Sequence, residues 1–465
     1  MKLKDEFVKN IKQYLGDEYD DFISSFSNPN EKGVHVNISK CQDNLCIEEL
    51  IAATKIDDFE NCYYTNEERI GSHPLSHSGL VYSQDPSAMM PVNAILPLLS
   101  KNMKVLDLCA APGGKSSQLA TYLTKLNGLL VSNEINKARN QILKSNMERM
   151  GYLNNIVTNK SAMELAIDYP SYFDLIVVDA PCSGEGMFRK YPESIDEWTS
   201  ESNLNCSTMQ REILDYAVRC LKPGGYLLYS TCTYSPLENE EIIRYICANY
   251  NFSVVNPPES IISSSVCIKD YDYYKQMEPL NGIEGCRRFY PHKYKGEGQF
   301  LCILKSNEKT LGADLKSTKP SKLFKLLNGP SLEIVKKSLK DSVDLSDYDL
   351  YTLSQLIVAL PKGDYPYIPA NKVTMAGVIV GEIVKNRLVP HHQLFHMLGH
   401  LFYNKIELSG QIDLLAKYLH GEEIYVESSP NGFGVISYYG ASIGGFKSVN
   451  GRLKNYYPKG LRNNN

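Results

Sequence analysis

Several features that are common in other protein classes are missing from this sequence. No run of about 18 uninterrupted apolar residues, the length that a membrane-spanning helix needs, occurs along its 465 residues. The first segment, MKLKDEFVKNIKQYLGDEYDDF, is charged and lacks the apolar stretch found in secretory signals. We therefore expect a cytoplasmic protein with no membrane partner.

The twelve cysteines show no spacing typical of zinc sites or disulfide frameworks. No CxxC pair occurs, and no cysteine follows Cys302. Disulfide frameworks belong mainly to short secreted chains, so we expect reduced thiols. His392, His396 and His400 share one face of an expected helix, but no cysteine or HExxH pattern accompanies them. We expect no metal site, and we interpret these histidines as surface or RNA-facing side chains.

The sequence also lacks a general excess of basic residues. Its net charge is −4, from 49 basic and 53 acidic residues, so it has no global basic footprint. The segment from Pro430 onward differs, because it holds five basic residues and no acidic one, interleaved with tyrosines. Such a run is often only solvated surface, but rings stack on bases and cations meet phosphates. We predict that this segment contacts RNA through Lys447, Arg452, Lys454, Lys459 and Arg462.

The hydrophobic pattern changes along the chain. Residues 1–70 contain an expected helix near 5–26, a strand at 34–39 and a helix near 47–54, which together indicate a small α+β unit. From Lys104 to Lys305, short apolar runs alternate with helical stretches, as in the buried parallel strands of a doubly wound α/β sheet. The expected strands are 104–109, 128–134, 155–159, 173–180 and 224–232, with a late strand at 299–305.

A polar segment rich in lysine and serine divides the rest of the chain. We predict a catalytic domain at 71–305, a linker at 306–322, a small mixed domain at 323–387 and a β-rich domain at 388–465. This last domain begins with a helix near 391–402 and continues as a β stretch from about 422 to 447. We expect the protein to be a monomer.

A glycine-rich turn closes the first predicted strand of the catalytic domain and opens a helix. Residues 106–115 read LDLCAAPGGK, whose small residues let a ligand approach the backbone and the N–H groups of the helix N-terminus. A dinucleotide site would need GxGxxG, which is absent. Glu134 ends the next strand, where a carboxylate can accept both ribose hydroxyls of a nucleoside. These features favour S-adenosylmethionine, and a tight turn without a ligand is the alternative.

Two cysteines follow neighbouring strands of the predicted sheet. Asp179 and Cys182 come after strand 173–180 and Cys232 ends strand 224–232, so all three should face the ligand edge of the sheet. A lone cysteine is often a small buried hydrophobe, but two beside an acid and a cofactor loop favour chemistry. A thiolate that adds to C6 of cytosine gives C5 the electron density to accept a methyl group. Hydrogen bonding at N3 favours this addition, and Asp179 is the best candidate for it.

Five long motifs occur in a characteristic order. They are GLVYSQDPSAMMP at 79–91, LCAAPGGK at 108–115, VDAPCSGEGMFRK at 178–190, LKPGGYLLYSTCTYSPLENE at 221–240 and RRFYPHKYKGEGQF at 287–300. In these motifs the chain resembles the Nop/Sun family of RNA cytosine-5 methyltransferases, and especially its bacterial ribosomal-RNA members of the RsmF type. Residues 418–422, 444–447 and 452–462 are similar to the PUA-like RNA-binding end of those bacterial enzymes.

The resemblance implies a Rossmann-like methyltransferase domain between an N-terminal RNA-binding unit and C-terminal small mixed and PUA-like domains. It implies that Cys232 attacks C6 of the base and that Cys182 assists release of the methylated product. The implied substrate is RNA, in the form of small-subunit ribosomal RNA or the assembling subunit. The implied contacts to S-adenosylmethionine are Cys109, Ala110, Ala111, Pro112, Gly113, Gly114, Lys115, Glu134 and Asp179.

Two positions depart from the family pattern. The family often has an acid after the third strand that contacts the adenine, but residues 158–161 read TNKS, which leaves Asn159 or Ser161 for that contact. His35 stands where the family usually has arginine, so one RNA contact is expected to be weaker. Two other functions remain open: a catalytically idle RNA-binding or ribosome-assembly factor, and an N- or O-methyltransferase, which has no use for two strand-end cysteines.

Overall fold

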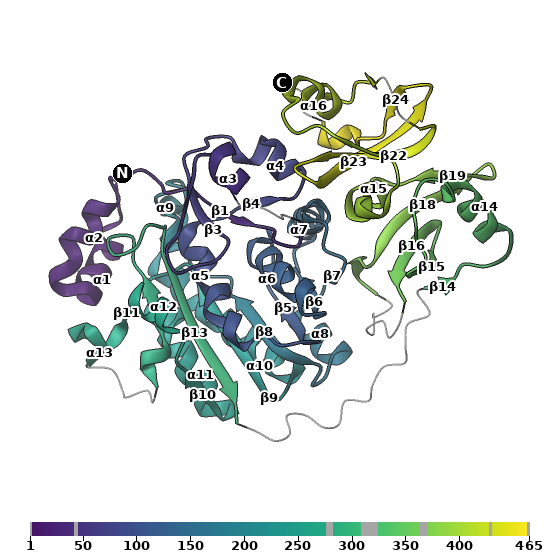
Figure 1. Ribbon diagram of the computed structural model, residues 1–465. Coiled ribbons are helices and arrows are strands. Elements are labelled where there is room, and N and C mark those ends of the chain that lie inside the picture. Colours follow the sequence, from purple (N-terminus) through teal and green to yellow (C-terminus); the bar gives the residue numbers. More distant parts are fainter. Residues whose placement is uncertain are drawn as a thin grey trace.

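The computed structural model describes residues 2–40, 45–275, 282–307, 324–362, 371–426 and 430–462. These residues form one large sheet flanked by helices and three smaller sheets. The large sheet occupies the lower left of Figure 1, and the C-terminal domains lie to its upper right. Within this part of the chain, every helix is too short or too polar to cross a membrane.

The large sheet has the doubly wound order that the sequence predicts. Its strands follow one another as β11-β12-β13-β9-β8-β5-β6-β7-β17, with β10 paired to β13. The five strands from β5 to β9 are parallel to one another. Those five strands are β5 (Lys104–Asp107), β6 (Leu129–Asn133), β7 (Asn155–Thr158), β8 (Phe173–Asp179) and β9 (Leu221–Thr231).

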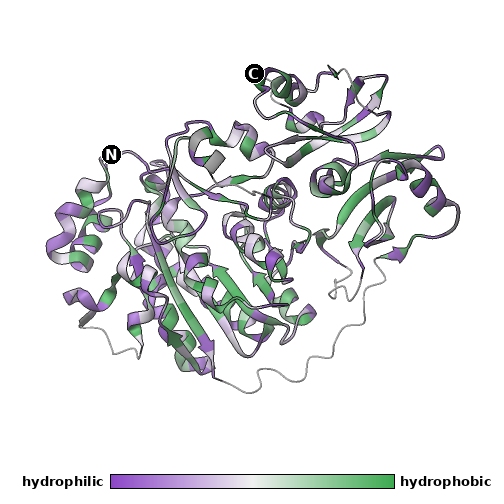
Figure 2. Ribbon diagram, in the orientation of Figure 1, coloured by the Kyte–Doolittle hydropathy of each residue, from purple (hydrophilic) through white to green (hydrophobic). Residues whose placement is uncertain are grey.

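Helices cover both faces of this sheet because successive strand residues point to opposite sides. Ile176 and Val178 of β8 pack into one core, and Leu175 and Val177 pack into the other. The first core includes α8 (Ala162–Asp168), α10 (Ser200–Cys220) and α11 (Glu240–Tyr250), and the second includes α5 (Pro86–Ile95), α6 (Gly114–Lys125), α7 (Lys137–Met150) and α12 (Glu259–Ser263). Figure 2 shows these strands as largely hydrophobic between helices of mixed polarity.

Short strands at the sheet edges were not predicted. They are β10 (Phe252–Val255), β11 (Val266–Cys267), β12 (Arg287–Phe289) and β17 (Val373–Met375). The predicted late strand is β13 (Gln299–Ser306), which runs antiparallel to β9. Strand β17 lies within the predicted small mixed domain, yet it pairs with β7 of the catalytic sheet. Strands of two to four residues carry too little alternation to be recognised in the sequence.

The first 83 residues form two parts with different neighbours. The expected helix near 5–26 is broken at Gly16 into α1 (Asp5–Leu15) and α2 (Tyr19–Ser25), which pack on the catalytic domain through Phe7 and Phe22. The other elements are β1 (Gly33–Val36), α3 (Leu45–Leu50), β2 (Ala53–Lys55), β3 (Cys62–Thr65), α4 (Pro74–His77) and β4 (Val81–Ser83). Their sheet has the order β2-β3-β1-β4, so β4 completes the N-terminal sheet from beyond residue 70.

The C-terminal half holds two five-stranded sheets. The first has the order β14-β15-β16-β18-β19 and the second β20-β22-β23-β24-β21. The first contains β14 (Lys325–Leu326), α14 (Gly329–Leu339), β15 (Tyr348–Leu353), β16 (Leu356–Pro361), β18 (Val378–Val384) and β19 (Arg387–Pro390). The second region contains α15 (His392–Met397), β20 (Lys405–Glu407), α16 (Ile412–His420), β21 (Ile424–Tyr425), β22 (Gly432–Tyr438), β23 (Ala441–Val449) and β24 (Arg452–Asn455). Most of the predicted linker at 306–322 lies outside the described residues.

The N-terminal sheet and the last domain share one hydrophobic core. Val34 and Leu75 from the N-terminal part are buried in the same cluster as Leu415, Ile443 and Phe446 from the C-terminal part. Figure 1 shows α4 beside the strands β22 and β23. The two ends of the chain therefore stabilise each other.

Candidate active site

The site is a cleft at the carboxyl edge of the parallel strands, where ligands bind in open α/β sheets. Its volume is about 680 Å³. Loops that follow β5, β6, β8 and β9 bring together six of the predicted residues, namely Cys109, Ala111, Glu134, Asp179, Cys182 and Cys232. The other predicted cofactor residues, Ala110, Pro112, Gly113, Gly114 and Lys115, do not line the cleft themselves.

Contacts within the glycine-rich turn explain why it supports the cleft. The N–H of Ala110 donates to the carbonyl of Asn133 at 2.8 Å, and the Arg139 guanidinium donates to the carbonyl of Ala111 at 2.7 Å. Gly113 adopts φ 116°, a conformation that strongly favours glycine, directly before α6. The turn is therefore fixed to the neighbouring strand and to α7, so that the first part of the loop faces the cleft.

Glu134 presents a buried carboxylate to the cleft, next to the glycine-rich turn. Its side chain is 4% exposed, accepts a hydrogen bond from the N–H of Asn136 at 2.8 Å, and lies 3.4 Å from the Arg139 guanidinium. Asn136 in turn caps α7 by accepting from the N–H groups of Ala138 and Arg139. The carboxylate is thus oriented by its own turn.

Asp179 is held between a cation and a hydroxyl. Lys115 Nζ lies 2.8 Å from one carboxylate oxygen, and Ser230 Oγ donates to the other at 2.7 Å. Lys115 therefore acts on the site by holding the Asp179 carboxylate in place, and it does not line the cleft itself. Beneath them, burial raises the pKa of Asp107 to about 7, although Ser116 donates to that carboxyl.

The two predicted cysteines lie side by side. The Sγ atoms of Cys182 and Cys232 are 3.4 Å apart, at the ends of β8 and β9. The hydrogen bond with Cys232 raises the pKa of Cys182 well above its ordinary value, and burial adds to that shift. Cys182 is therefore held as a neutral thiol beside the sulfur of Cys232.

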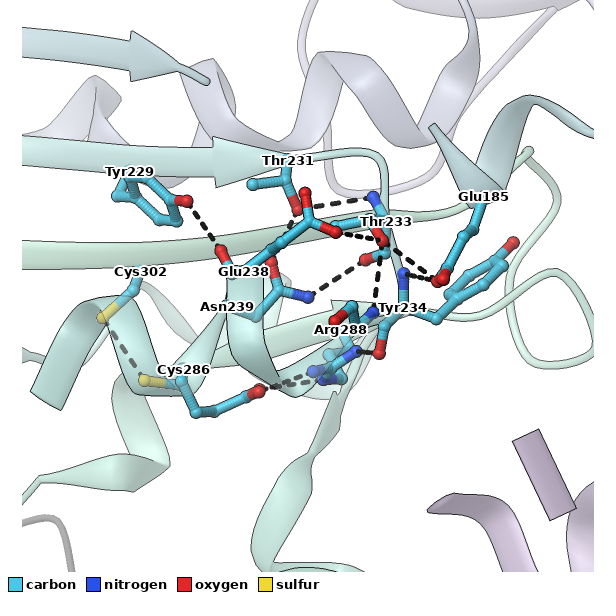
Figure 3. A network of polar contacts seen from close by, with 12 residues as sticks. Glu185, Tyr229, Thr231, Thr233, Tyr234, Glu238, Asn239, Cys286, Arg288 and Cys302 are labelled. Carbon is cyan, nitrogen blue, oxygen red and sulfur yellow. Dashed lines mark hydrogen bonds and ion pairs between the residues drawn. The ribbon is translucent and has the colours of Figure 1, made fainter. Parts of the chain in front are cut away.

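Buried carboxylates join the two cysteine loops, which sequence reasoning did not predict. Glu238 accepts from the N–H of Ser183 at 2.9 Å and from its hydroxyl at 2.6 Å. Glu185 accepts from the hydroxyl of Thr233 at 3.0 Å and from the N–H of Tyr234 at 2.9 Å. Figure 3 shows Glu185, Thr233, Tyr234 and Glu238 meeting in this network. Each loop thus carries a carboxylate that is bound by the other loop.

The backbones of these loops also approach closely. The N–H of Gly186 donates to the carbonyl of Cys232 at 2.7 Å, and a Cβ atom at residue 186 would lie 2.5 Å from that oxygen. Behind them, Arg288 pairs with Glu240 at 2.6 Å and donates to the carbonyl of Tyr234 at 3.0 Å (Figure 3). This packing fixes the separation of the two thiols.

Two exposed apolar residues at the cleft were also missed. Ile135, next to Glu134, is 66% exposed, and Met163 at the start of α8 is 49% exposed. Both line the cleft, so they offer apolar walls to a flat ring beside the Glu134 carboxylate. The sequence signal was weak, because isolated exposed hydrophobic residues are common.

The residues at the two departures from the family pattern lie in different environments. Asn159 donates to the carbonyls of Glu134 and Ile135 and does not line the cleft, whereas Ser161 does line it. His35 is buried, stacks on Tyr82 and lies 2.9 Å from Ser117 Oγ. It therefore packs between domains and is not available to RNA.

The three histidines of the expected helix have different environments. His396 is buried against the carbonyls of Ile443 and Arg149, and it stacks on His392. Only His400 is exposed. The interpretation of all three as surface or RNA-facing side chains was therefore wrong for His396. Among the described residues, no group of three or more potential ligands is arranged to hold a metal.

The basic segment near the C-terminus is less uniform than the sequence suggests. Lys447, Lys454 and Lys459 are exposed, but Arg452 forms an ion pair with Glu423, and Arg462 donates to the carbonyl of Tyr457. Of the interleaved tyrosines, Tyr438 and Tyr457 are buried in the shared core and cannot stack on a base. An acidic residue outside the segment neutralises part of it, which the local charge count could not reveal.

The sheet order and its ligand cleft define the Rossmann-like class of methyltransferases. A solved methyltransferase homolog from Pyrococcus horikoshii is 26% identical, with a TM-score of 0.54, over 65% of this chain and 95% of that one. NSun6 from the same organism, solved with SFG, has the same fold at 19% identity and a TM-score of 0.55, over 66% of this chain and 98% of that one.

Three family models match successive parts of the chain. "16S rRNA methyltransferase RsmB/F" matches residues 94–305, "N-terminal domain of 16S rRNA methyltransferase RsmF" matches 3–86, and "Methyltransferase RsmF PUA domain" matches 403–463. The three matches follow the order of the domains and confirm the resemblance to the RsmB/F methyltransferase family seen in the sequence.

Curated relatives match along nearly their whole length. "Ribosomal RNA small subunit methyltransferase F" from Vibrio vulnificus is 28% identical over 99% of this chain and 97% of the relative. The protein of that name from Vibrio campbellii is 29% identical over 95% and 93% of the two chains. The similarity therefore extends across nearly all of this chain and of those relatives.

Proposed function

We propose that the protein transfers a methyl group from S-adenosylmethionine to C5 of a cytosine in small-subunit ribosomal RNA. The observation that carries this proposal is the pair of sulfur atoms, 3.4 Å apart, in the cleft that also contains Glu134 and Asp179. The names of the matching family and of its curated relatives support ribosomal RNA as the substrate. An N- or O-methyltransferase needs no such thiol pair.

The cleft residues fit a nucleoside cofactor. A volume of about 680 Å³ is within the usual range of about 300–1,000 Å³ for small-molecule sites. S-adenosylmethionine supplies a methyl group activated by its sulfonium. Glu134 would accept hydrogen bonds from the ribose hydroxyls, while Ile135 and Met163 would contact the faces of the adenine. The SFG bound in the NSun6 structure is an analogue of this cofactor, which is consistent with that assignment.

Cys232 is proposed as the nucleophile. Its sulfur forms a bond to C6 of the cytosine, and the electron pair of the 5,6 double bond becomes available at C5 to accept the methyl group. An ionised carboxylate can only accept hydrogen bonds, so Asp179 is suited to the 4-amino group of the base. The ammonium of Lys115, 2.8 Å from Asp179, holds this carboxylate in place. Asp179 is thus positioned in the cleft to meet the hydrogen-bonding edge of cytosine.

Cys182 is proposed to act in product release. After methylation the C5 proton must leave as the bond between C6 and the Cys232 sulfur breaks, which restores the aromatic ring and the thiolate. The interaction with Cys232 is the largest cause of the raised pKa of Cys182. Once Cys232 is bonded to carbon its sulfur is neutral, so Cys182 ionises more readily and can take the C5 proton. The order of the two steps follows from this coupling.

We propose RNA-binding roles for the two ends of the chain and catalysis for residues 71–305. The exposed lysines Lys447, Lys454 and Lys459 are the residues of the last domain best placed to meet phosphates. We also propose that the protein acts as a monomer. The target cytosine must leave its stack to reach Cys232, which favours loops and bulges over continuous duplex.

The proposal is tested with protein-free 16S ribosomal RNA and S-adenosylmethionine that carries a labelled methyl group. We expect the label in 5-methylcytidine after digestion to nucleosides. Label on an exocyclic nitrogen or a ribose oxygen would assign a different methyl transfer. RNA binding with no label in any nucleoside, from either protein-free RNA or assembling small subunits, would support the idle assembly factor instead.

A further inference from the structure

A second pocket lies where the N-terminal, catalytic and C-terminal parts of the chain meet. Its volume is about 250 Å³, smaller than usual for an organic cofactor. It is lined by His77 of α4, Lys144 and Arg149 of α7, His391 and His392 at the start of α15, and Tyr457. Figure 1 shows α7 and α15 side by side at this junction. No residue of the pocket lines the cofactor cleft.

The junction contains cations without a matching carboxylate. Arg149 donates to the carbonyl of Ser76 at 2.6 Å, and Lys40, beside the pocket, donates to the carbonyl of Ser78 at 3.1 Å and lies 3.3 Å from His396 Nε2. In the described part of the chain, neither cation forms an ion pair. Glu148 is the single carboxylate among the pocket residues. Buried or half-buried charges are normally paired, so this cluster is short of negative charge.

Hydrogen-bonding capacity is also left over in the pocket. His392 Nδ1 is buried and has no hydrogen-bond partner in the structure. Its ring is stacked between His396 and the edge of Tyr457, which holds it in place. Burial and the neighbouring Arg149 lower the pKa of Lys40 to about 7, as expected where a counter-ion is lacking. An anion in the pocket would meet both the positive charge and the unused nitrogen.

We propose that this junction pocket, formed by Lys144, Arg149 and His392, binds a phosphate group. A phosphate carries the missing negative charge and offers several acceptor oxygens to lysine, arginine and histidine donors. The group is either free inorganic phosphate or a phosphodiester of bound RNA. The second source rests on the proposed function, and the first does not. In both cases the ligand contacts three parts of the chain at once and stabilises their arrangement.

The first measurement is the melting temperature of the full chain as inorganic phosphate is added at constant ionic strength, with chloride as the balancing anion. A ligand that binds only the folded state raises this temperature as its concentration increases. We expect the rise to be lost in Lys144→Glu, at the half-exposed rim, and in His392→Leu, which keeps the ring-sized packing. Lys125→Glu, an exposed charge reversal at the end of α6, is the matched control and should retain the rise.

The second measurement is the affinity for 16S ribosomal RNA at several salt concentrations. If the phosphate belongs to RNA, Lys144→Glu should reduce the salt slope by about one unit, while Lys125→Glu leaves it unchanged. An unchanged slope together with a lost phosphate response identifies free phosphate as the ligand. If the wild type and the variants Lys144→Glu, His392→Leu and Lys125→Glu all show the same rise in melting temperature with phosphate, the proposal is overturned. The proposal is also overturned if phosphate does not raise the melting temperature of any of these proteins and the salt slopes of RNA binding are equal. Neither measurement needs methyl transfer, so a failure of the proposed function would be seen separately.

Discussion

Individual side chains determine which chemistry the cleft can support. Two thiols at 3.4 Å cannot both ionise easily, because each charge opposes the other. The hydrogen bond with Cys232 and burial raise the pKa of Cys182 well above its ordinary value, so the pair does not lose both protons together. The proposed reaction accordingly uses the two sulfur atoms in separate steps.

The cysteine roles predict opposite outcomes for two substitutions. Cys232→Ala should abolish methyl transfer and leave cofactor binding nearly unchanged, because its thiol acts on the base. Cys182→Ala should accumulate a covalent protein–RNA adduct, because attack proceeds and release does not. Denaturing gels with labelled RNA detect the adduct. An adduct in Cys232→Ala and none in Cys182→Ala would reverse the assignment.

The raised pKa of Asp107 makes the stability of the folded protein depend on pH. Burial raises its pKa to about 7 in the folded protein, from about 4 in the unfolded chain. Between these values the folded state holds more protons, so stability falls as pH rises, by up to about 1.4 kcal/mol per pH unit. Asp107→Asn should remove this part of the slope in denaturant unfolding from pH 4 to 7. The exposed control Asp196→Asn should retain it, and equal slopes for both variants would contradict the assignment.

Among the secondary-structure elements, the connections after β8 and β9 position the thiols. Glu238 receives hydrogen bonds from Ser183 in one connection and from Asn203 and Gln210 in α10. Burial raises the pKa of this carboxyl, because it disfavours the charged form. The hydrogen bonds that Glu238 receives offset this effect. The strand ends bring the cysteines near each other, and this network holds them at a fixed separation.

Glu238→Gln tests the network. The new amide group would face donors at Ser183 and Gln210, and each unsatisfied donor costs about 1–3 kcal/mol. We expect at least a tenfold slower methyl transfer with a cofactor dissociation constant within about twofold of the wild type. Glu241→Gln, which removes a half-buried ion pair with Arg244 on α11, is the matched control and should leave both quantities unchanged. Equal loss of cofactor affinity would show that the network supports the cofactor side instead.

The molecule as a whole depends on contacts between its two ends. Val34 and Leu75 share a core with Leu415 and Phe446 across more than 300 residues of sequence. The last domain therefore covers part of the N-terminal sheet as well as presenting lysines to solvent. Removing this domain affects stability as well as RNA binding.

Deletion of residues 388–465 should lower the melting temperature by more than about 5 °C and promote aggregation, because it exposes several buried aliphatic side chains. Circular dichroism and light scattering measure both effects. Lys454→Glu, at an exposed lysine of the same domain, should keep the melting temperature and reduce the salt slope of RNA binding by about one unit. A truncated chain as stable as the full one would contradict the shared core.

The central parallel strands, the loop at 109–115 and the convergence of Cys182 and Cys232 follow from the sequence alone. They depend on runs of buried residues and on the rule that parallel strands end at one edge, and both are local or topological properties. The tertiary structure alone decided the pairing of β17 with β7, the burial of Tyr438 and Tyr457, and the Glu185–Glu238 network. Each of these joins residues far apart in the chain or depends on the packing around one residue. A composition or a spacing cannot show which distant partner excludes water from a given side chain, because that depends on how the domains pack.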